Sequence, residues 1–153
     1  MPEHAGIRIQ RAGPADAARL LPLCMAHAQY ERYALCFDAQ WSARTAEALR
    51  SGRLRAWLLL AGEAALGYAS ATLDHATLNA APFLHMDCLY LQESARGQGH
   101  GARLLQAVCA EALACGCTQL QWQTPAWNES AQRFYRREGA LMQLKQRFAL
   151  ALV

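Results

Sequence analysis

The stretch Ser94–Ala102, SARGQGHGA, places three glycines within five residues directly ahead of the apolar segment RLLQAVCAEAL (103–113). In that segment the apolar residues recur at helical spacing, at Leu104, Leu105, Val108, Cys109, Ala112 and Leu113. A glycine-rich turn that opens a helix directs backbone N–H groups and the positive end of the helix dipole toward one point, which suits a phosphate. The stretch therefore predicts a turn that binds a phosphate compound at the start of a helix.

Upstream of this turn, the pattern predicts a strand, two helices and a hairpin. IRIQR (7–11) alternates as a short strand, and PADAARLLPLCMAHAQYE (14–31) is helical, with Pro22 expected to kink or interrupt it. WSARTAEALRSG (41–52) predicts a second helix, with Ser42 as its N-cap and Gly52 as its stop. The hairpin then joins AWLLLA to LGYASATL through Gly62-Glu63, and FLHMDCLYL (83–91) is a further strand.

Downstream, Gly116 ends the helix and TQLQWQT (118–124) predicts the next strand. NESAQRFYRR (128–137) is a short helix closed by Gly139, and ALMQLKQRFALALV (140–153) reads as one or two last strands. This order predicts a mixed α/β fold, antiparallel in its first half and built of βαβ units in its second. We expect a single domain over residues 1–153, with a mixed central sheet flanked by helices.

Composition narrows the class of protein. Apolar residues make up 54% and charged residues 18% of 153 residues, which fits one globular domain. No run reaches the ~18 apolar residues of a membrane helix, and MPEHAGIRIQ (1–10) lacks a signal-peptide layout, so we expect a cytoplasmic protein without membrane contact. The net charge is +3 and the arginines are scattered, so we expect no nucleic-acid partner.

The six cysteines predict reduced thiols rather than disulfides in such a protein. There is no Cys-x-x-Cys pair, and Cys115-Gly116-Cys117 lacks partner ligands at a suitable spacing. We therefore expect no metal site.

Three phosphate-binding designs compete for the glycine turn. A Walker loop needs Lys-Ser/Thr after its last glycine, whereas Ala102-Arg103 follows here. Gly97-x-Gly99-x-x-Ala102 formally fits a dinucleotide fingerprint, but the segment 117–124 lacks the acidic residue that would hold a ribose. The third design, Arg/Gln-x-x-Gly-x-Gly/Ala, matches RGQGHG (96–101). A tight turn without a ligand is the remaining interpretation.

Together with CLYLQESARGQGHGARLL (88–105), the segment WNESAQRFYRREGA (127–140) resembles the GNAT superfamily of acyl-CoA-dependent N-acetyltransferases. The second segment carries the more specific motif, because it specifies many positions at once. The resemblance covers nearly the whole chain and implies a GNAT fold and acetyl-CoA as the acetyl donor.

Within that superfamily, the chain is most similar to the spermidine/spermine and thialysine acetyltransferase group. AQYER (28–32) resembles that group's Tyr-Glu pair, which implies that Tyr30 and Glu31 contact the acceptor amine. Asp87 stands where the group carries Glu, and Cys88 stands where it has a second acid, so recognition of a polycation is in question. Homodimers are common in this group, and the resemblance therefore implies a homodimer here.

The resemblance also implies a set of cofactor contacts. The backbone of the strand end would meet the acetyl and pantetheine portion, the turn would hold the pyrophosphate, and the start of the later helix would line the far side of the channel. In that order, the residues are Leu89, Tyr90 and Leu91; Arg96, Gly97, Gln98, Gly99, His100, Gly101 and Ala102; and Asn128, Glu129, Ser130 and Ala131. Tyr135 matches the tyrosine beside the thioester sulfur, and His100 is expected to be exposed in the turn.

Acetyl transfer to an amine needs an acceptor for the ammonium proton, a donor for the oxyanion and help for the leaving thiolate. Asp87 would accept the proton directly or through water, and Tyr135 would hydrogen-bond the sulfur. Cys88 is expected to be a passive strand thiol. We therefore expect direct attack by a diamine, a polyamine or a lysine-like amino acid. The alternatives are an acetyltransferase for an antibiotic or a protein N-terminus, and a non-catalytic acyl-CoA-binding domain.

Overall fold

The computed structural model describes residues 6–153, in two compact units that divide after Gln123. The first five residues, which bear on the secretion prediction, lie outside the described residues. The first unit contains a five-stranded sheet in the order β1-β2-β3-β4-β5. Its strands are β1 (Ile7–Arg11), β2 (Arg55–Ala61), β3 (Ala64–Ala76), β4 (Ala81–Leu91) and β5 (Leu120–Trp122).

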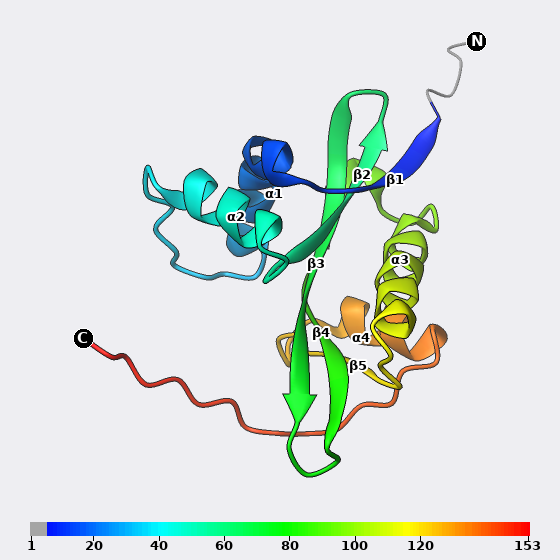
Figure 1. Ribbon diagram of the computed structural model, residues 1–153. Coiled ribbons are helices and arrows are strands. Elements are labelled where there is room, and N and C mark those ends of the chain that lie inside the picture. The colour runs from blue at the N-terminus through cyan, green and yellow to red at the C-terminus, as the bar shows by residue number, and fades with distance from the viewer. Residues whose placement is uncertain (1–5) are drawn as a thin grey trace. The chain divides into compact units, whose positions relative to one another are not determined.

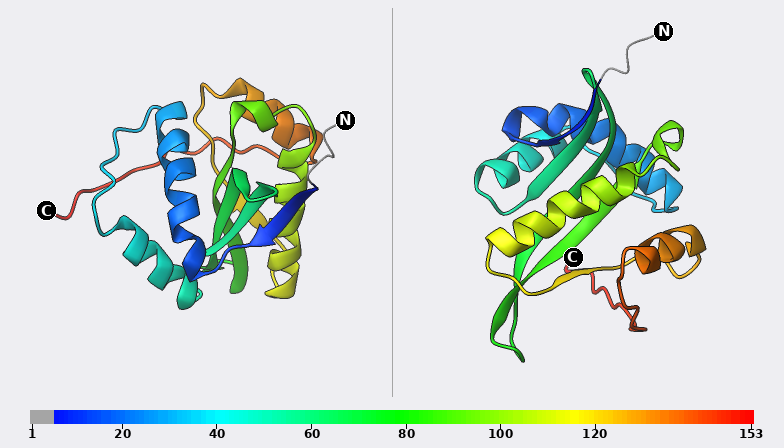
Figure 2. Two further views of the ribbon diagram at one scale, coloured as in Figure 1. Left: turned by 90° about the horizontal axis from the view of Figure 1, so that it is seen from above. Right: turned by 90° about the vertical axis from the view of Figure 1, so that its right-hand side faces the viewer.

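The sheet has the mixed topology that the sequence predicts. The first four strands pair antiparallel, whereas β5 pairs parallel to β4 after a crossover through α3 (His100–Ala114). Helices α1 (Ala17–Tyr30) and α2 (Trp41–Arg50) lie on one side of the sheet and α3 lies on the other (Figures 1 and 2). The prediction of a mixed α/β fold is therefore confirmed, and the extent of the single domain stays a prediction.

Two local predictions in the first unit were wrong, namely the interruption of the first helix at Pro22 and the N-cap at Ser42, whereas a kink at Pro22 stays a prediction. Helix α1 follows a 3-10 turn, Pro14–Asp16, and continues unbroken through Pro22. Helix α2 begins at Trp41 with Gln40 as its N-cap, so Ser42 lies inside the helix. The helix starts earlier because Asp38 forms the turn that precedes it. The Asp38 carboxylate accepts a hydrogen bond from the Gln40 N–H at 3.0 Å, and its carbonyl accepts one from the Trp41 N–H at 3.2 Å.

A β-bulge in β4 decides which side chains face which side of the sheet. Ser70 of β3 pairs with Cys88, and Ala71 pairs with Met86, so Asp87 is the extra residue between them. Because paired residues share a face, Met86 lies on the α3 side whereas Cys88 lies on the side of α1 and α2. Regular alternation would have left the side chains of Met86 and Cys88 on the same face.

Each face of the sheet carries its own apolar layer. On the side of α1 and α2, the buried cluster comprises Ala12, Leu20, Leu23, Ala56, Leu58, Leu60 and Tyr68, with Cys88 and Tyr90 packed against it. On the other face, Leu84 and Met86 are buried, as are Leu104 and Val108 of α3. The two layers hold β4 between helices, and the bulge adds a change of face within that strand.

The second unit contains one helix, α4 (Glu129–Arg137). Asn128 is its N-cap, since its Oδ1 accepts the Ala131 N–H at 3.2 Å, and Gly139 follows the helix with a φ of 91°. Within the described chain, residues 140–153 form no strand, so the prediction of a last strand or two was wrong. A strand needs a neighbour for its backbone groups, and no described strand pairs with this segment.

Candidate functional site

The glycine turn has the backbone conformation that an anion site needs. Gly97 and Gly99 have φ angles of 73° and 81°, a region that favours glycine. A Cβ at either position would meet no atom within 4 Å, so the space above the turn is open. The first helical hydrogen bond of α3 runs from the Arg103 N–H to the Gly99 carbonyl. The N–H groups of residues 100–102 precede this bond and therefore have no helical acceptor. This backbone fits a pyrophosphate.

The polar side chains of the turn mostly hold the turn itself. The Nε of Arg96 donates to the Leu91 carbonyl at 3.0 Å, and Gln98 Nε2 donates to the Ser94 carbonyl at 3.0 Å. The Arg96 guanidinium lies 4.7 Å from the ring centroid of Tyr30 and 5.6 Å from that of Tyr90. Arg96 therefore links the end of β4 to the end of α1 through cation–π contacts.

His100 differs from the sequence-based expectation. It is the first residue of α3 and is half-buried rather than exposed. Its Nδ1 is buried and has no hydrogen-bond partner within the described residues. His100 starts a helix whose next turn is buried at Leu104 and Leu105, so its position at the first turn is closer to the packed layer than a turn residue would be.

The end of β4 keeps one backbone edge without a strand partner. Strand β5 pairs with Leu84, His85 and Met86 only. Beyond the bulge, β4 continues to Leu91 beside β3, and no strand among residues 6–153 pairs with its other edge. The backbone of Leu89, Tyr90 and Leu91 on that edge therefore has no strand partner among the described residues, and its role toward an extended ligand stays a prediction from the resemblance.

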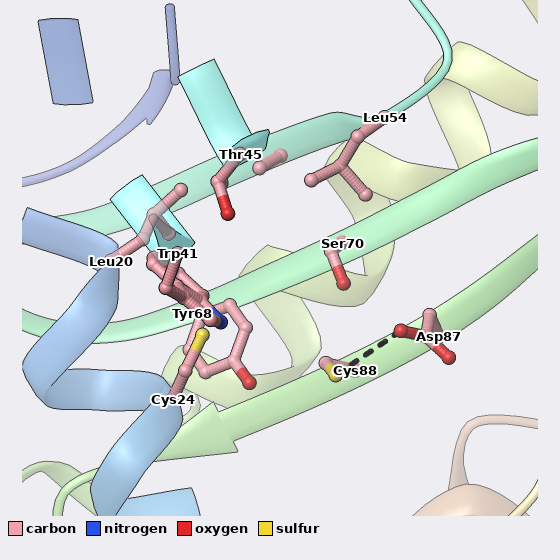
Figure 3. Close-up of a pocket in the computed structure, with 10 residues that line it drawn as sticks. Leu20, Cys24, Trp41, Thr45, Leu54, Tyr68, Ser70, Asp87 and Cys88 are labelled. Atoms are coloured by element: carbon pink, nitrogen blue, oxygen red, sulfur yellow. Dashed lines mark hydrogen bonds between the residues drawn. The ribbon is translucent and has the colours of Figure 1, made fainter. Parts of the chain in front are cut away.

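A pocket of about 120 Å³ opens beside the bulge (Figure 3). Its polar lining comes from Asp87, Cys88, Ser70, Tyr68 and Cys24, all within the first unit. Its apolar walls are Leu20, Trp41, Leu54 and Ala56, and Thr45 completes the lining. Asp87 is the one carboxylate in this lining, and its charge beside apolar walls favours the cationic end of an aliphatic molecule.

The thiols of this pocket are held in their neutral form. Burial, together with the charge of Asp87, raises the pKa of Cys88 to about 12. Burial also raises the pKa of Cys24, with the negative charge of Asp87 adding to the shift. The thiolate is the nucleophilic form of cysteine, so neither thiol is activated for covalent catalysis.

Beside the pocket lies a hydrogen-bonded chain that the sequence analysis did not identify. The Tyr68 hydroxyl and His27 Nδ1 are 2.7 Å apart, and His27 Nε2 is 3.1 Å from a carboxylate oxygen of Glu31. The His27 ring also stacks on Tyr90, with centroids 5.1 Å apart. The spacing of His27 and Glu31 by four residues on a helix was the available signal.

The two residues predicted to contact the acceptor lie at the end of α1. Tyr30 is 40% exposed and its ring is 6.2 Å from that of Tyr90. Glu31 is the C-cap of α1 and lies against His27. The structure brings Tyr30 to the turn through Arg96, whereas it joins Glu31 to Tyr68 through His27.

The remaining predicted residues belong to the second unit. Asn128 is buried and caps α4, Glu129 and Ser130 are exposed in the first turn, and Ala131 is half-buried. Tyr135 is half-buried, with its ring 5.1 Å from that of Phe134. The roles of these residues toward a cofactor stay predictions.

No group of three or more His, Cys, Asp or Glu residues in 6–153 is arranged to hold a metal ion. No helix in the same range has the length and apolar character needed to cross a membrane.

Comparison with known proteins gives one family match, over residues 24–140, to the model described as "Acetyltransferase (GNAT) family". Among curated proteins, thialysine N-epsilon-acetyltransferase from Bos taurus is 33% identical over 57 residues. The match covers 37% of this chain and about a third (34%) of that relative's length.

Several solved structures share the fold. Aminoglycoside N-acetyltransferase AAC(6')-Iy in complex with CoA superposes with a TM-score of 0.84, at 18% identity, over 100% of this chain and 99% of that one. The aminoglycoside acetyltransferase meta-AAC0020 from an uncultured soil metagenomic sample, in complex with sisomicin, gives 0.81 at 16% identity, over 95% and 96%. Ribosomal-protein-alanine N-acetyltransferase from Brucella melitensis biovar Abortus 2308 gives 0.74 at 15% identity, over 95% and 100%.

Proposed function

Since this chain belongs to the acetyltransferase (GNAT) family, a family of acetyl-CoA-dependent N-acetyltransferases, we propose that it acetylates a primary amine of a small molecule. The favoured acceptors are a diamine, a polyamine and a lysine-like amino acid. One observation carries the proposal: a pocket with apolar walls places a single carboxylate, Asp87, at the bulge of β4.

The pocket supports an aliphatic amine on grounds of size and charge. Its volume of about 120 Å³ is well below the ~300 Å³ at which sites for drug-sized ligands begin. The pocket therefore suits the end of a chain rather than a whole ring system. Asp87 would hold the ammonium by a charge-assisted hydrogen bond, and the methylene groups would lie against Leu20 and Trp41.

The donor side of the proposal uses the turn and the end of β4. Residues 97–102 would hold the pyrophosphate of acetyl-CoA through backbone N–H groups, and the open edge at Leu89–Leu91 would pair with the pantetheine chain. Asn128, Glu129, Ser130 and Ala131 stay the predicted lining of the far side. When bound, acetyl-CoA supplies the acetyl group as a thioester.

The chemistry would run by direct attack, with both substrates bound. A backbone N–H near Leu89 would donate to the developing oxyanion, and the Tyr135 hydroxyl would donate to the departing sulfur. Asp87 would orient the amine and is the candidate to accept its proton. The neutral Cys88 thiol argues against a covalent acetyl-cysteine route.

Aminoglycosides are a second class of acceptor, favoured by a different observation. Solved structures named as aminoglycoside acetyltransferases share this fold over nearly the whole chain, with TM-scores of 0.81 and 0.84. An aminoglycoside carries primary amines too, so only an aminomethyl end would need to enter the pocket.

Mass-spectrometric screening against a panel of amines tests the proposal. The panel pairs acetyl-CoA with linear diamines, spermidine, thialysine, lysine, sisomicin and a peptide with a free N-terminal alanine. We expect product with a linear amine at kcat/KM at least tenfold above that for sisomicin. Tight binding of acetyl-CoA without any product would favour a non-catalytic binding domain instead.

A homodimer and a cytoplasmic location stay predictions for the whole protein. Sedimentation velocity of the purified chain, with and without acetyl-CoA, measures the first. A mass of one chain in both conditions would contradict it.

A further inference from the structure

The pocket has a second polar boundary, formed by the Tyr68 hydroxyl and the chain behind it. Tyr68 is 2% exposed and His27 is 8% exposed, whereas the side chain of Glu31 keeps 19% of its surface in solvent. Tyr68 belongs to β3, His27 belongs to α1, and Glu31, four residues after His27, is the C-cap of α1. These hydrogen bonds therefore link the pocket wall at Tyr68 to the protein surface at Glu31.

The charge of Glu31 sets the direction of these hydrogen bonds. An ionised carboxylate only accepts, so His27 Nε2 must donate to it. Nδ1 of the neutral ring is then the acceptor, and the Tyr68 hydroxyl must donate to it. The Tyr68 oxygen then faces the pocket with its lone pairs, beside the neutral thiols of Cys24 and Cys88, and an ammonium group that enters would donate to it in place of a thiol.

We propose that His27 is the base of the reaction, taking the acceptor's proton through the Tyr68 hydroxyl while Glu31 stabilises the imidazolium. This inference rests on the proposed acetylation of an amine. Tyr68 touches the substrate and is the catalytic residue of the relay, and Glu31 is a positioning residue. Asp87 then binds the ammonium rather than deprotonating it.

The proton moves from the ammonium to His27 in two transfers that occur together, and each bond that breaks is matched by one that forms. An ammonium N–H bond breaks as a new O–H bond forms on Tyr68, and the old O–H bond breaks as an N–H bond forms on His27 Nδ1. The positive charge moves from the substrate to the imidazolium, which faces the Glu31 carboxylate. After product release, the reverse transfers return the proton to water in the pocket.

Two physical arguments favour this route over Asp87 alone. In water an imidazole is a stronger base than an aspartate carboxylate by about 2.6 pKa units. In addition, burial strongly raises the pKa of Tyr68, so a standing phenolate is disfavoured and the hydroxyl must lose one proton as it gains another. A relay meets that condition, because His27 lies 2.7 Å behind the hydroxyl.

The first test does not depend on turnover. In the ligand-free protein labelled with ¹⁵N-histidine, long-range ¹H–¹⁵N correlations should show His27 as the Nε2–H tautomer with an unprotonated Nδ1. Glu31→Gln should shift the His27 nitrogen signals, whereas Glu138→Gln should leave them unchanged. The Nδ1–H tautomer in the wild-type protein would overturn the relay.

Single-turnover kinetics give the second test. Tyr68→Phe retains the ring and should lower the rate of acetyl transfer about 100-fold, with the Kd of acetyl-CoA changed less than twofold. His27→Ala should fall by a similar factor and recover at least tenfold with added imidazole, and the double variant should not be rescued. His75→Ala, an exposed histidine of β3, is the matched control.

The outcomes separate this inference from the proposed function. If the wild-type protein acetylates an amine while Tyr68→Phe stays within twofold of its rate, the relay falls and the function stands. If the wild-type protein acetylates no amine on the panel, both fall. Should His27→Ala fail to fold, Tyr68→Phe and the tautomer measurement still decide the matter.

Discussion

The thiol of Cys88 donates a hydrogen bond to the carboxylate of Asp87 across 3.7 Å, at the bulge where β4 changes the face it presents to the helices. Burial first, and then the charge of this neighbour, raise the pKa of Cys88 to about 12. The pair therefore keeps its negative charge on the carboxylate, which is the partner that can hold a cationic amine.

We expect Cys88 to resist alkylation in the native protein. At pH 8, iodoacetamide should modify the exposed Cys36 rapidly and leave Cys88 unmodified, because the thiolate is the reactive form. Peptide mass spectrometry measures both sites, and unfolding in urea should make their rates equal. Acetyl-Cys88 formed from acetyl-CoA without an acceptor would contradict direct attack.

Asp87→Asn should weaken binding of the amine. Removing the charge from the pocket should raise KM for the amine at least tenfold, which corresponds to about 1.4 kcal/mol, and leave KM for acetyl-CoA within twofold. Asp74→Asn, the same change at an exposed position of β3, should alter neither. If Asp87→Asn abolishes transfer while Tyr68→Phe does not, Asp87 is the base instead.

Gly99→Ala should weaken binding of acetyl-CoA as well as stability. Its φ of 81° costs a side chain about 1 kcal/mol, and the new methyl group would project into the open space above the turn. Gly62→Ala in the β2–β3 turn, with a φ of 58°, carries a similar strain away from the turn. Isothermal titration should show a Kd at least tenfold higher for Gly99→Ala only.

The sequence predicted those helices, strands and turns whose formation depends on residues close together in the chain. Periodicity located the helices, and glycine marked their ends and the β2–β3 turn, because these features depend on residues close in the chain. The bulge at Asp87 was not predicted, since it depends on the register between β3 and β4. Residues 140–153 alternate like a strand, but pairing needs a partner that alternation does not supply.

The candidate site shows the same division. The turn and Asp87 follow from a motif, whereas the contact of Tyr68 with His27 joins residues 41 positions apart and arises only once α1 packs on β3. Motif matching could therefore not predict the Tyr68–His27 hydrogen bond, whereas the four-residue spacing of His27 and Glu31 could have been recognised in the sequence.

Tyr135→Phe should lower the rate of the chemical step and leave the cofactor's affinity intact. The change removes only the hydroxyl proposed to donate to the departing sulfur, and we expect kcat to fall about 10- to 100-fold. Tyr33→Phe removes a hydroxyl from a 52% exposed side chain and should leave kcat unchanged. An unchanged single-turnover rate for Tyr135→Phe would remove this residue from the mechanism.

Glu111→Gln should destabilise the fold at neutral pH and lose this effect in acid. The Glu111 carboxylate of α3 accepts hydrogen bonds at 2.9 Å from Arg11 of β1 and from Arg55 of β2, and these bonds lower its pKa. Arg11 remains half-exposed and Glu111 keeps 20% of its side-chain surface, so solvent screening limits the expected loss to about 1–2 kcal/mol at pH 7.

The pH dependence of this loss has a definite sign. A carboxyl group with a lowered folded pKa contributes stability that is present above its unfolded value of about 4.3 and is lost as pH falls through the folded value. Urea unfolding at pH 7, 5 and 3 should therefore show the wild type and Glu111→Gln converging toward pH 3. Glu138→Gln, at an exposed position, should differ from the wild type by less than about 0.5 kcal/mol throughout. A gap that persists undiminished at pH 3 would assign the loss to packing of α3 rather than to the charge of Glu111.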